Sequence, residues 1–487
     1  MTTDHHLPRY HLRPPHGYVN DPNGPVYVDG RWHLYFQYVS DTPRRGAVVW
    51  GHASSADLAT WRYHRPALSP DPGGDDRDGC WSGNAVVADG AITAFYSGYR
   101  RGHPYQSVLA ATSIDGGRSF GPPRAAVADP DPADEVVEFR DPFVWWEDDR
   151  WLMLVGAGNA KGRASARLYE SADLTTWHYL GPFVELARTV SSAGADGADA
   201  LDGADRRCDT GDMWECPQLL SFGDRDVLLV GAYCRAGGGI TEVLSIAGLR
   251  RDGRMDQPAV TRFDKGANFY AASAMRTSPA GPLVWGWVTE GRSADWTVEA
   301  DWSGMLSLPR SVSLTPAGRL ACRPADGLDT LRGEQLEPSE GSTTSTMAYD
   351  GLPAQVELEF ALAGAARGGG DAAPTRVSLR CGGDEHLDVV VDWSTGRVSV
   401  DRDNASQDQR AHRGVYAWTE PQISSSGVLG LRWFVDGSVS ELFTSSGQCS
   451  TVRFYPTAPP PWRLEVTGLD TGDSVRAWQL AGPTTGG

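Results

Sequence analysis

The sequence predicts an all-β fold, a five-bladed β-propeller followed by a C-terminal β-sandwich. Over the first 310 residues, short apolar runs alternate with turn residues, and amphipathic segments of helical length are scarce. Within this stretch a hairpin-like unit occurs five times and a Ser-x-Asp marker recurs at equal spacing. Further along the chain, short strands with a different arrangement of turns follow.

The hairpin unit consists of an extended apolar run, a tight polar turn and a second extended run. In its first two copies the turn is Asp29-Gly30 and Asp89-Gly90, and Asp-Gly between apolar runs is a strong hairpin signal. The five copies occupy residues 26–36, 85–96, 143–155, 219–233 and 269–288. We expect each copy to open with the innermost strand of one propeller blade.

The Ser-x-Asp marker lies between the hairpins. Its aspartates, Asp57, Asp115 and Asp173, are separated by two equal intervals of 58 residues. A repeated all-β unit of this length is typical of propeller blades, each of which is a four-stranded sheet. The stretch from residue 20 to about residue 310 has room for five such units.

The length and the change of pattern indicate two domains. A chain of 487 residues exceeds what one hydrophobic core usually supports. The sequence predicts the propeller over residues 1–310, a connector over 311–340 and the β-sandwich over 341–487. A further hairpin with an Asp436-Gly437 turn lies in the last of these.

Composition excludes several classes of partner. The net charge of −18 argues against nucleic acid, because phosphate binding needs a basic surface. No apolar run is long enough to span a bilayer, so no membrane is expected. The N-terminus lacks the basic start and apolar stretch of a secretory signal, so we expect a cytoplasmic protein, or a secreted one whose signal is absent from this sequence.

The cysteines argue against a metal site, and the aromatic residues favour a carbohydrate ligand. The seven cysteines are scattered and form no C-x-x-C pair, so neither a zinc site nor a disulfide framework is expected. Eighteen tryptophans and sixteen tyrosines exceed the needs of a simple core, although most of them belong there. Aromatic faces stack on sugar rings, so an uncharged carbohydrate is a suitable ligand.

Each predicted hairpin is preceded by a polar anchor. These five anchors are Asp21, Asn84, Asp141, Glu215 and Asn268. If the innermost strands begin at the same end of the propeller, the anchors converge on one pocket. Three of the five are carboxylates, an unusual excess for one end of a channel.

Three local motifs surround the carboxylates. Asp21 lies in Asn-Asp-Pro-Asn-Gly, Asp141 follows Arg140 in Arg-Asp-Pro, and Glu215 lies in Trp-Glu-Cys-Pro, an apolar setting typical of a general acid. Taken singly, each motif is as consistent with a turn, a salt bridge or a strand residue. Together they match glycoside hydrolysis, which needs one carboxylate to attack or activate water and one to protonate the leaving oxygen.

The order of these motifs resembles glycoside hydrolase family 32, the invertases, levanases and exo-inulinases. The resemblance extends over nearly the whole chain and includes residues 35–38, 50–53, 268–271 and 306–310. It implies the five-bladed propeller plus β-sandwich fold and hydrolysis of terminal β-D-fructofuranosyl units with retention, through a covalent fructosyl-enzyme. It implies a sucrose-like or fructan substrate and no metal or organic cofactor. The chain could also assemble as a homo-oligomer.

The resemblance also implies roles for individual residues. Asp21 would be the nucleophile, Glu215 the acid/base and Asp141 the transition-state stabiliser. The residues implied to bind the substrate are Asn20, Gln37, Trp50, Trp81, Ser82, Arg140, Asn268 and Tyr270. Tyr18-Val19, Val39-Ser40, Trp81 and Asn268 depart from the common family pattern, which bears on substrate choice more than on reaction type.

Three alternatives remain at the level of sequence. The same fructosyl-enzyme could be captured by a sugar, which would make the protein a fructosyltransferase. An inverting arabinofuranosidase or xylosidase also places three acids in a propeller. A non-catalytic sugar-binding protein is the third, and the presence of all three acids argues against it. Preference for sucrose, levan or inulin, and exo or endo action, do not follow from the motifs.

Overall fold

The structure of the protein is a computed structural model, which describes residues 4–103, 105–127, 130, 135–191, 207–235, 239–364, 372–424 and 427–481. The prediction of an all-β chain is confirmed. Among the described residues the one α-helix is α1 (Ala294–Ala300), and two 3-10 helices, η2 (Asp326–Leu331) and η3 (Pro421–Ser424), accompany the strands. None of the helices described could cross a membrane.

The first part of the chain forms five sheets in which strands that follow one another in sequence are antiparallel neighbours. The first sheet contains β1 (Gly17–Val28), β2 (Arg31–Val39), β3 (Val49–Ser55) and β4 (Arg62–Tyr63), with β21 (Trp302–Ser303) parallel to β1. The second contains β5 (Gly79–Ala88), β6 (Ala91–Tyr99), β7 (Ser107–Ser113) and β8 (Arg124–Val127). The third contains β9 (Val136–Glu147), β10 (Arg150–Asn159), β11 (Arg163–Ser171) and β12 (His178–Ala187).

Two more sheets complete this part. The fourth contains β15 (Met213–Phe222), β16 (Arg225–Cys234), β17 (Gly239–Arg251) and β18 (Arg254–Arg262). The fifth contains β19 (Phe269–Met275), β20 (Leu283–Val288), β22 (Met305–Leu306), β23 (Arg310–Leu314) and β24 (Leu320–Pro324). Strands β13 (Thr189–Ser191) and β14 (Arg207–Asp209) form a separate two-stranded ribbon. All five predicted hairpins are present, as the first two strands of each sheet.

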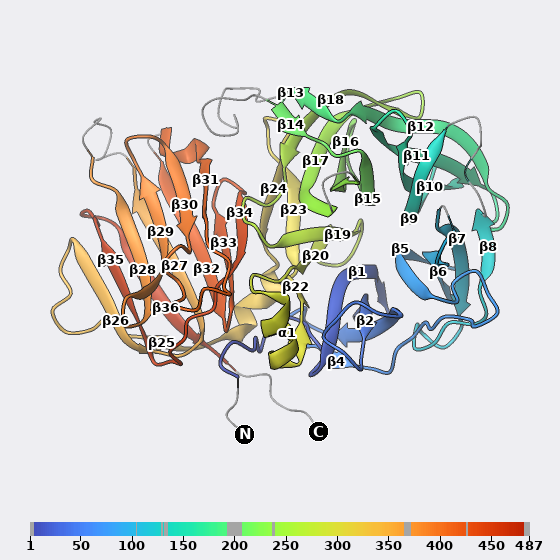
Figure 1. The fold of residues 1–487 in the computed structure, drawn as a ribbon. Helices are drawn as coiled ribbons and strands as arrows, with labels where there is room; N and C mark the ends of the chain where they lie inside the picture. Colours follow the sequence, from blue (N-terminus) through green and yellow to red (C-terminus); the bar gives the residue numbers. More distant parts are fainter. Residues whose placement is uncertain are drawn as a thin grey trace.

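The first strands of the five sheets lie around a common centre. Strands β1, β5, β9, β15 and β19 contact one another in this order, and β19 contacts β1, so they close a ring (Figure 1). The Ser-x-Asp marker closes the turn after the third strand in three of the sheets. In the first of them Asp57 accepts hydrogen bonds from the backbone N–H groups of Ala59 and Thr60, at 2.9 and 2.8 Å.

The last part of the chain forms two six-stranded sheets that pack face to face (Figure 1). One contains β25 (Arg332–Leu336), β27 (Gln355–Ala363), β32 (Val428–Asp436), β33 (Val439–Thr444), β34 (Cys449–Arg453) and β36 (Ser474–Leu480). The other contains β26 (Thr346–Leu352), β28 (Thr375–Gly382), β29 (Glu385–Asp392), β30 (Arg397–Asp401), β31 (Val415–Thr419) and β35 (Trp462–Thr467). Their facing side chains, such as Leu358, Trp433 and Leu379, share one hydrophobic core.

The predicted connector over residues 311–340 is not a separate segment. Strands β23 and β24 complete the fifth sheet, because without them β20 would have only the two-residue β22 as its second neighbour. Strand β25 already pairs with β36 of the six-stranded sheet. The passage from one part to the other is therefore limited to the residues around η2, between β24 and β25.

A network of buried charges joins the two parts. Arg310 of β23 donates to Asp264 at 2.8 Å and to Glu441 of β33 at 2.7 Å. The ring nitrogens of His11 lie 2.9 Å from Glu441 and 2.9 Å from Asp436. We call these five residues the border network. All of them are buried, so the charges are shielded from water and depend on one another.

Candidate active site

Every inner strand carries a β-bulge at the same height. In each case two residues of the inner strand oppose one residue of the next strand, which shifts the register by one. The bulged pairs are residues 20–21, 81–82, 141–142, 216–217 and 271–272. A bulge bends its strand and redirects the side chains beside it. Five bulges at one level therefore aim side chains from five sheets towards the centre of the ring.

Asp21 lies on the bulge of β1 and is held by donors from two sheets. The hydroxyl of Ser82 donates to Asp21 Oδ2, and the amide of Asn20 donates to Oδ1 at 3.1 Å. Gln37 Nε2 lies 3.5 Å from Oδ2 and also donates to Ser82. Burial raises the pKa of Asp21, the hydrogen bond from Ser82 lowers it, and the negative charge of Glu215 raises it. The carboxylate is thus fixed in position.

Asp141 lies on the bulge of β9 with a left-handed backbone, at φ 64°. Its Oδ1 accepts a hydrogen bond from Ser97 at 3.2 Å, and its Oδ2 accepts one from the backbone N–H of Cys216 at 3.0 Å. Burial raises the pKa of Asp141, the charge of Arg140 lowers it, and the charges of Glu215 and Asp21 raise it, so that together they bring it to about 7. The left-handed conformation of a non-glycine residue at this point is a form of strain found at functional sites.

Glu215 immediately precedes the bulge of β15. Arg140 Nε donates to its Oε1 at 3.0 Å, and the hydroxyl of Tyr270 lies 2.9 Å from its Oε2. Glycine at position 231 makes room for this tyrosine, because a Cβ there would come within 2.8 Å of the Tyr270 ring. The apolar neighbours of Glu215 in the sequence do not surround its carboxylate, since Trp214 packs into the core between two sheets.

The three carboxylates form one cluster, which we call the acid cluster. Cys216 lies between them, with Sγ 3.6 Å from Asp21 Oδ2 and 3.6 Å from Asp141 Oδ2. Arg140 is the one cation among the described residues that donates a hydrogen bond to any of the three. Three acids facing one buried arginine can hold a proton among them, which suits acid–base chemistry.

Most residues predicted to bind the substrate adjoin this cluster. Asn20, Gln37 and Ser82 form a hydrogen-bonded chain to Asp21, with Asn20 donating to Gln37 at 2.8 Å. Arg140 and Tyr270 contact Glu215 as described. Trp81 precedes Ser82 on the bulge of β5, is partly exposed and stacks on Tyr99, with ring centroids 4.3 Å apart.

Trp50 does not line the sugar site as predicted. Its side chain is fully buried and packs in the core between the first two sheets, against Tyr35 and Tyr96. Its indole N–H donates to the backbone carbonyl of Trp81 at 3.0 Å. Trp50 therefore supports Trp81 through this hydrogen bond, and its complete burial leaves no ring face exposed for stacking on a sugar.

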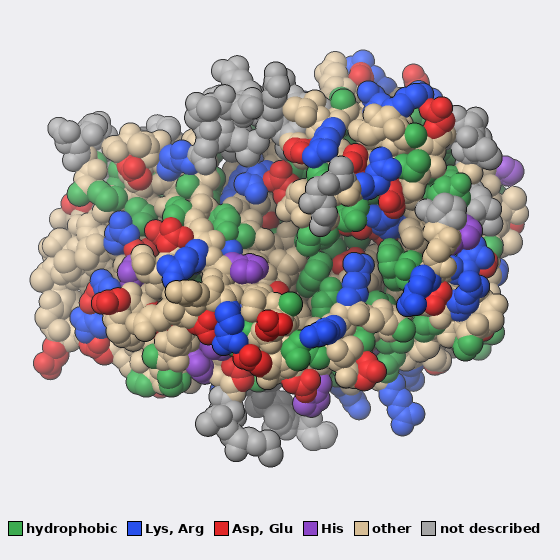
Figure 2. Space-filling model, in the orientation of Figure 1, with side chains coloured by type: hydrophobic (Ala, Val, Ile, Leu, Met, Phe, Trp, Pro, Cys, Tyr) green, Lys and Arg blue, Asp and Glu red, His purple; other side chains and the backbone are tan. Residues whose placement is uncertain are grey.

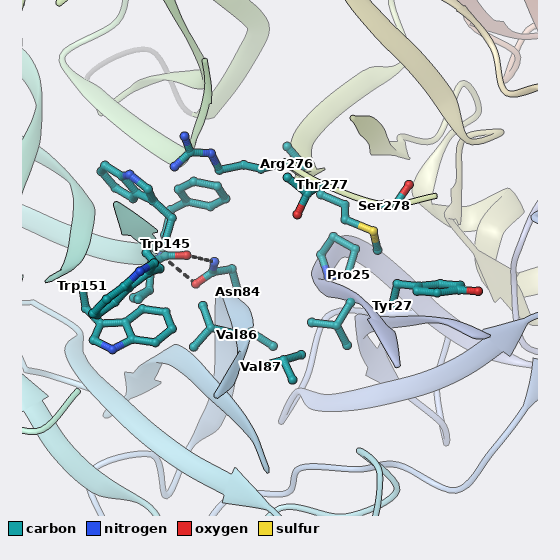
Figure 3. A pocket seen from close by; sticks show the side chains of 17 residues that line it. Pro25, Tyr27, Asn84, Val86, Val87, Trp145, Trp151, Arg276, Thr277 and Ser278 are labelled. Carbon is teal, nitrogen blue, oxygen red and sulfur yellow. Dashed lines mark hydrogen bonds between the residues drawn. The ribbon is translucent and has the colours of Figure 1, made fainter. Parts of the chain in front are cut away.

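Two of the predicted anchors also lie away from the acid cluster. Asn268 accepts hydrogen bonds from Arg402 and from the backbone of Arg453, at 2.8 and 2.9 Å, so its amide joins the fifth sheet to the six-stranded sheets. Asn84 lies further along the inner strand than the bulge and exchanges two hydrogen bonds with the backbone of Val144 (Figure 3). It faces a separate cavity of about 590 Å³ lined by later residues of the inner strands. Ser82 occupies the place expected for Asn84.

Two residues of the site were not found by sequence reasoning. Ser97 donates to Asp141 and also accepts its backbone N–H at 2.7 Å, and Cys216 donates its own backbone N–H to Asp141. Ser97 lies on β6, opposite the bulge of β5, and carries no motif. The Cys216-Pro217 pair resembles Asp141-Pro142, so a residue followed by proline on an inner strand is the signal that could have identified the bulge.

Comparison with protein families identifies both parts of the chain. The model for the glycosyl hydrolases family 32 N-terminal domain matches residues 11–324, and that for the glycosyl hydrolases family 32 C terminal matches residues 327–478. The boundary between the two matches coincides with the end of β24. Residues 311–324 thus fall on the side of the five sheets in this comparison as well.

Individual relatives resemble the chain over nearly its whole length. A raffinose invertase of Escherichia coli is 29% identical over 93% of this chain and 90% of its own. A sucrose-6-phosphate hydrolase of Salmonella typhimurium is 30% identical over 98% of this chain and 94% of its own. Two solved structures share the fold. A family 32 β-fructofuranosidase of Bombyx mori aligns with a TM-score of 0.78 and 24% identity over 99% of this chain and 95% of its own. Fructan 1-exohydrolase IIa of Cichorium intybus aligns with a TM-score of 0.79 and 21% identity over 99% of this chain and 98% of its own.

Proposed function

Because the chain belongs to glycoside hydrolase family 32, we propose that it is a retaining β-fructofuranosidase that releases terminal fructosyl units from sucrose or short fructo-oligosaccharides. The observation that supports this proposal most strongly is the acid cluster. Asp21 and Glu215 come from sheets far apart in the sequence, yet the charge of Glu215 acts on Asp21 and both lie beside Cys216. A pair of nearby carboxyl groups is what a retaining mechanism requires.

In the first step Asp21 attacks C2 of the fructosyl unit while the bond from C2 to the leaving oxygen breaks. Glu215 gives its proton to that oxygen, so the leaving sugar departs as a neutral alcohol and a fructosyl ester of Asp21 remains. Ser82 and Asn20 orient Asp21 for this attack. The hydroxyl of Tyr270 and the guanidinium of Arg140 orient Glu215.

In the second step Glu215 takes a proton from water, which attacks C2 and expels the Asp21 carboxylate. Two inversions restore the original configuration. Asp141 accepts hydrogen bonds from fructose hydroxyls and stabilises positive charge on the ring during both steps. Its rigid setting between Ser97 and Cys216 suits that role, because a stabiliser must already be in place when charge develops.

The fold assignment follows the same proposal. We interpret the closed ring of five sheets as a five-bladed β-propeller and the two six-stranded sheets as a β-sandwich. The propeller would then extend to the end of β24, and the sandwich would begin with β25. This division replaces the boundaries at 310 and 341 expected from the sequence.

The proposal is tested by hydrolysing sucrose in the presence of methanol. A retaining enzyme with a covalent intermediate forms methyl β-D-fructofuranoside, detectable by NMR, alongside fructose. Methyl α-D-fructofuranoside as the product would contradict the mechanism.

Glu215→Gln should lower kcat/KM most for substrates with poor leaving groups, because acid assistance matters most there. Equal losses on good and poor leaving groups would remove Glu215 from the acid role.

A further inference from the structure

The segment before β1 carries an aspartate followed by two histidines, at residues 4–6, and packs against the six-stranded sheets. The backbone oxygen of His6 accepts hydrogen bonds from the N–H and the hydroxyl of Ser438, at 3.0 and 2.8 Å. The segment passes so close to the turn at Gly437 that a Cβ there would come within 2.6 Å of the His6 backbone oxygen. The side chains of this segment are therefore presented from a fixed backbone.

Both histidines donate a hydrogen bond to the same carbonyl group. His5 Nε2 and His6 Nε2 lie 2.9 and 2.8 Å from the backbone oxygen of Pro456, which follows β34. A carbonyl oxygen only accepts hydrogen bonds, so each Nε2 carries a proton. In a neutral ring, Nδ1 then keeps its lone pair. Metal-binding histidines are oriented in this way, by a second ring N–H that donates to a backbone carbonyl or a carboxylate.

The Asp4 carboxylate lies beside the free nitrogen of His6. Its Oδ1 accepts the backbone N–H of His6 at 3.0 Å and lies 3.2 Å from His6 Nδ1. A neutral His6 brings no proton to this second contact, so the contact needs either a protonated ring or a cation between the two atoms. Adjacent ligand atoms of a tetrahedral zinc ion are about 3.4 Å apart, given its bond lengths to nitrogen and oxygen. The separation of the two atoms therefore suits zinc. The indole N–H of Trp302 holds the other carboxylate oxygen at 2.9 Å.

The three side chains form a group that an ion can reach. Asp4, His5 and His6 each offer one ligand atom, and these atoms lie within 4.8 Å of one another. Asp4 and His5 are partly exposed, which leaves space for water as a further ligand. The ring of Trp296 in α1 packs against His6, with centroids 5.6 Å apart. Figure 2 shows several Asp and Glu side chains on the surface around α1, and an acidic surface attracts cations.

We propose that Asp4, His5 and His6 form a binding site for a zinc ion, which joins the segment before β1 to the border between the five sheets and the six-stranded sheets. One oxygen of Asp4 and one ring nitrogen of each histidine would be the ligands, and water would complete the tetrahedron. Imidazole nitrogen suits zinc, whereas magnesium and calcium prefer oxygen ligands alone. The cysteine pattern argued against a zinc site, but no cysteine takes part in this one. The inference is independent of the proposed function.

The test titrates zinc chloride into the full chain, prepared without an affinity tag and freed of metal with EDTA, in a calorimeter. The wild-type protein should bind one zinc ion per chain at micromolar concentration. His5→Ala, at a partly exposed position, should weaken this binding by about tenfold or more, because a ligand is lost. Asp4→Asn should weaken it as well. His16→Ala removes a histidine whose side chain is 72% exposed and lies outside the group, so this variant should bind zinc as the wild type does.

Thermal unfolding gives a second measurement on the same proteins. Zinc at about 100 times its dissociation constant should raise the melting temperature of the wild type by about 2–4 °C, because only the folded chain presents the three ligands together. Magnesium should not raise it. His5→Ala should lose the shift with zinc, and His16→Ala should keep it.

Two results would overturn the inference. Binding that needs millimolar zinc would mean an adventitious ion only. Equal zinc affinity in His5→Ala and the wild type would place the ion elsewhere on the chain. Zinc binding is measured without substrate, so a failure of the proposed function would leave both results unchanged.

Discussion

The acid cluster and the border network each contain three carboxylates, but the cations around them differ. At the border, Asp264, Asp436 and Glu441 are matched by His11 and Arg310, and Asp436 also accepts three backbone N–H groups. In the acid cluster, the three carboxylates meet Arg140 alone among the hydrogen-bonded cations of the described residues. The carboxylates of the border network outnumber its cations by one, whereas those of the acid cluster outnumber theirs by two.

The pKa values follow this difference. Despite the cost of burial, hydrogen bonds and charge from His11 lower the pKa of Asp436, and the charge of Arg310 lowers that of Glu441. Burial raises the pKa of Asp21 and Asp141 instead, because too few partners offset it. The border network favours the ionised forms of Asp436 and Glu441 and joins two parts of the chain. The acid cluster shifts the pKa of Asp21 and Asp141 upwards, at a cost in stability, as is typical of groups that transfer protons.

The largest expected effect is a loss of activity without a loss of stability when Asp21 of the acid cluster is replaced. Asp21→Ala should lower kcat for sucrose by about 10⁴-fold or more, because no other described carboxylate occupies the nucleophile's position. Its melting temperature should stay equal or rise, since the change removes a buried negative charge from an acidic surrounding. The measurements are steady-state kinetics and thermal unfolding. A variant with near-normal kcat, or one that is strongly destabilised, would contradict the comparison.

The matched change at the border should have the reverse outcome. Glu441→Ala leaves His11 and Arg310 with fewer acidic partners in a dry environment, so we expect a loss of about 3–5 kcal/mol in the free energy of unfolding. Activity per folded molecule should change little, because the hydrogen-bond partners of Glu441 are His11, Arg310 and the backbone of Leu308, none of which belongs to the acid cluster. Urea unfolding followed by tryptophan fluorescence measures the first quantity and active-site titration the second. An unchanged midpoint in urea would show that the network contributes no stability.

The hairpins, the three acids and their convergence could be predicted from the sequence because local signals encode them. Asp29-Gly30 between apolar runs is a strong hairpin signal, and Asp21-Pro22 and Asp141-Pro142 each precede a predicted hairpin. The bulges were not predictable in the same way. A bulge interrupts the alternation of faces, so Cys216 joins the acid cluster while Trp214, on the other side of Glu215 in the sequence, packs into the core between two sheets.

The border network was beyond sequence reasoning for a different reason. His11 and Glu441 are separated by 430 residues, and nothing in the sequence around either residue indicates that they pair. The same holds for Asn268, which faces the six-stranded sheets, although its place before a hairpin suggested the sugar site. Trp50 was predicted to bind the substrate, but its side chain packs in the core and supports Trp81. The sequence alone does not distinguish these two positions. Long-range partners of this kind follow from packing and not from local pattern.

The pH dependence of stability tests the role of His11 in the border network. Burial lowers the pKa of His11, but its hydrogen bonds to Asp436 and Glu441 and their charges raise it to about 9 in the folded protein, against an ordinary value of 6.5. The folded state thus binds a proton that the unfolded state loses as the pH rises above 6.5, so this stabilisation is present below 6.5 and disappears as the pH passes 9. The full difference is on the order of 3 kcal/mol. Between pH 7.5 and 9, His11→Gln should flatten the dependence of unfolding free energy on pH, and equal slopes would contradict it.

The smallest expected effect concerns a single hydrogen bond in the acid cluster. The Ser82 hydroxyl donates to Asp21 and lowers its pKa, so Ser82→Ala should raise that pKa and move the acidic limb of the kcat/KM profile to higher pH by about one unit. Thr451→Ala removes a comparable hydroxyl from Asp264 at the border and should leave the profile in place while lowering stability. An acidic limb that stays fixed in Ser82→Ala would mean that Asp21 is not the group whose ionisation the profile reports. A shift to lower pH would mean that the Ser82 hydroxyl stabilises the protonated form of Asp21. The proposed contrast between the two groups of carboxylates would then not hold for Asp21.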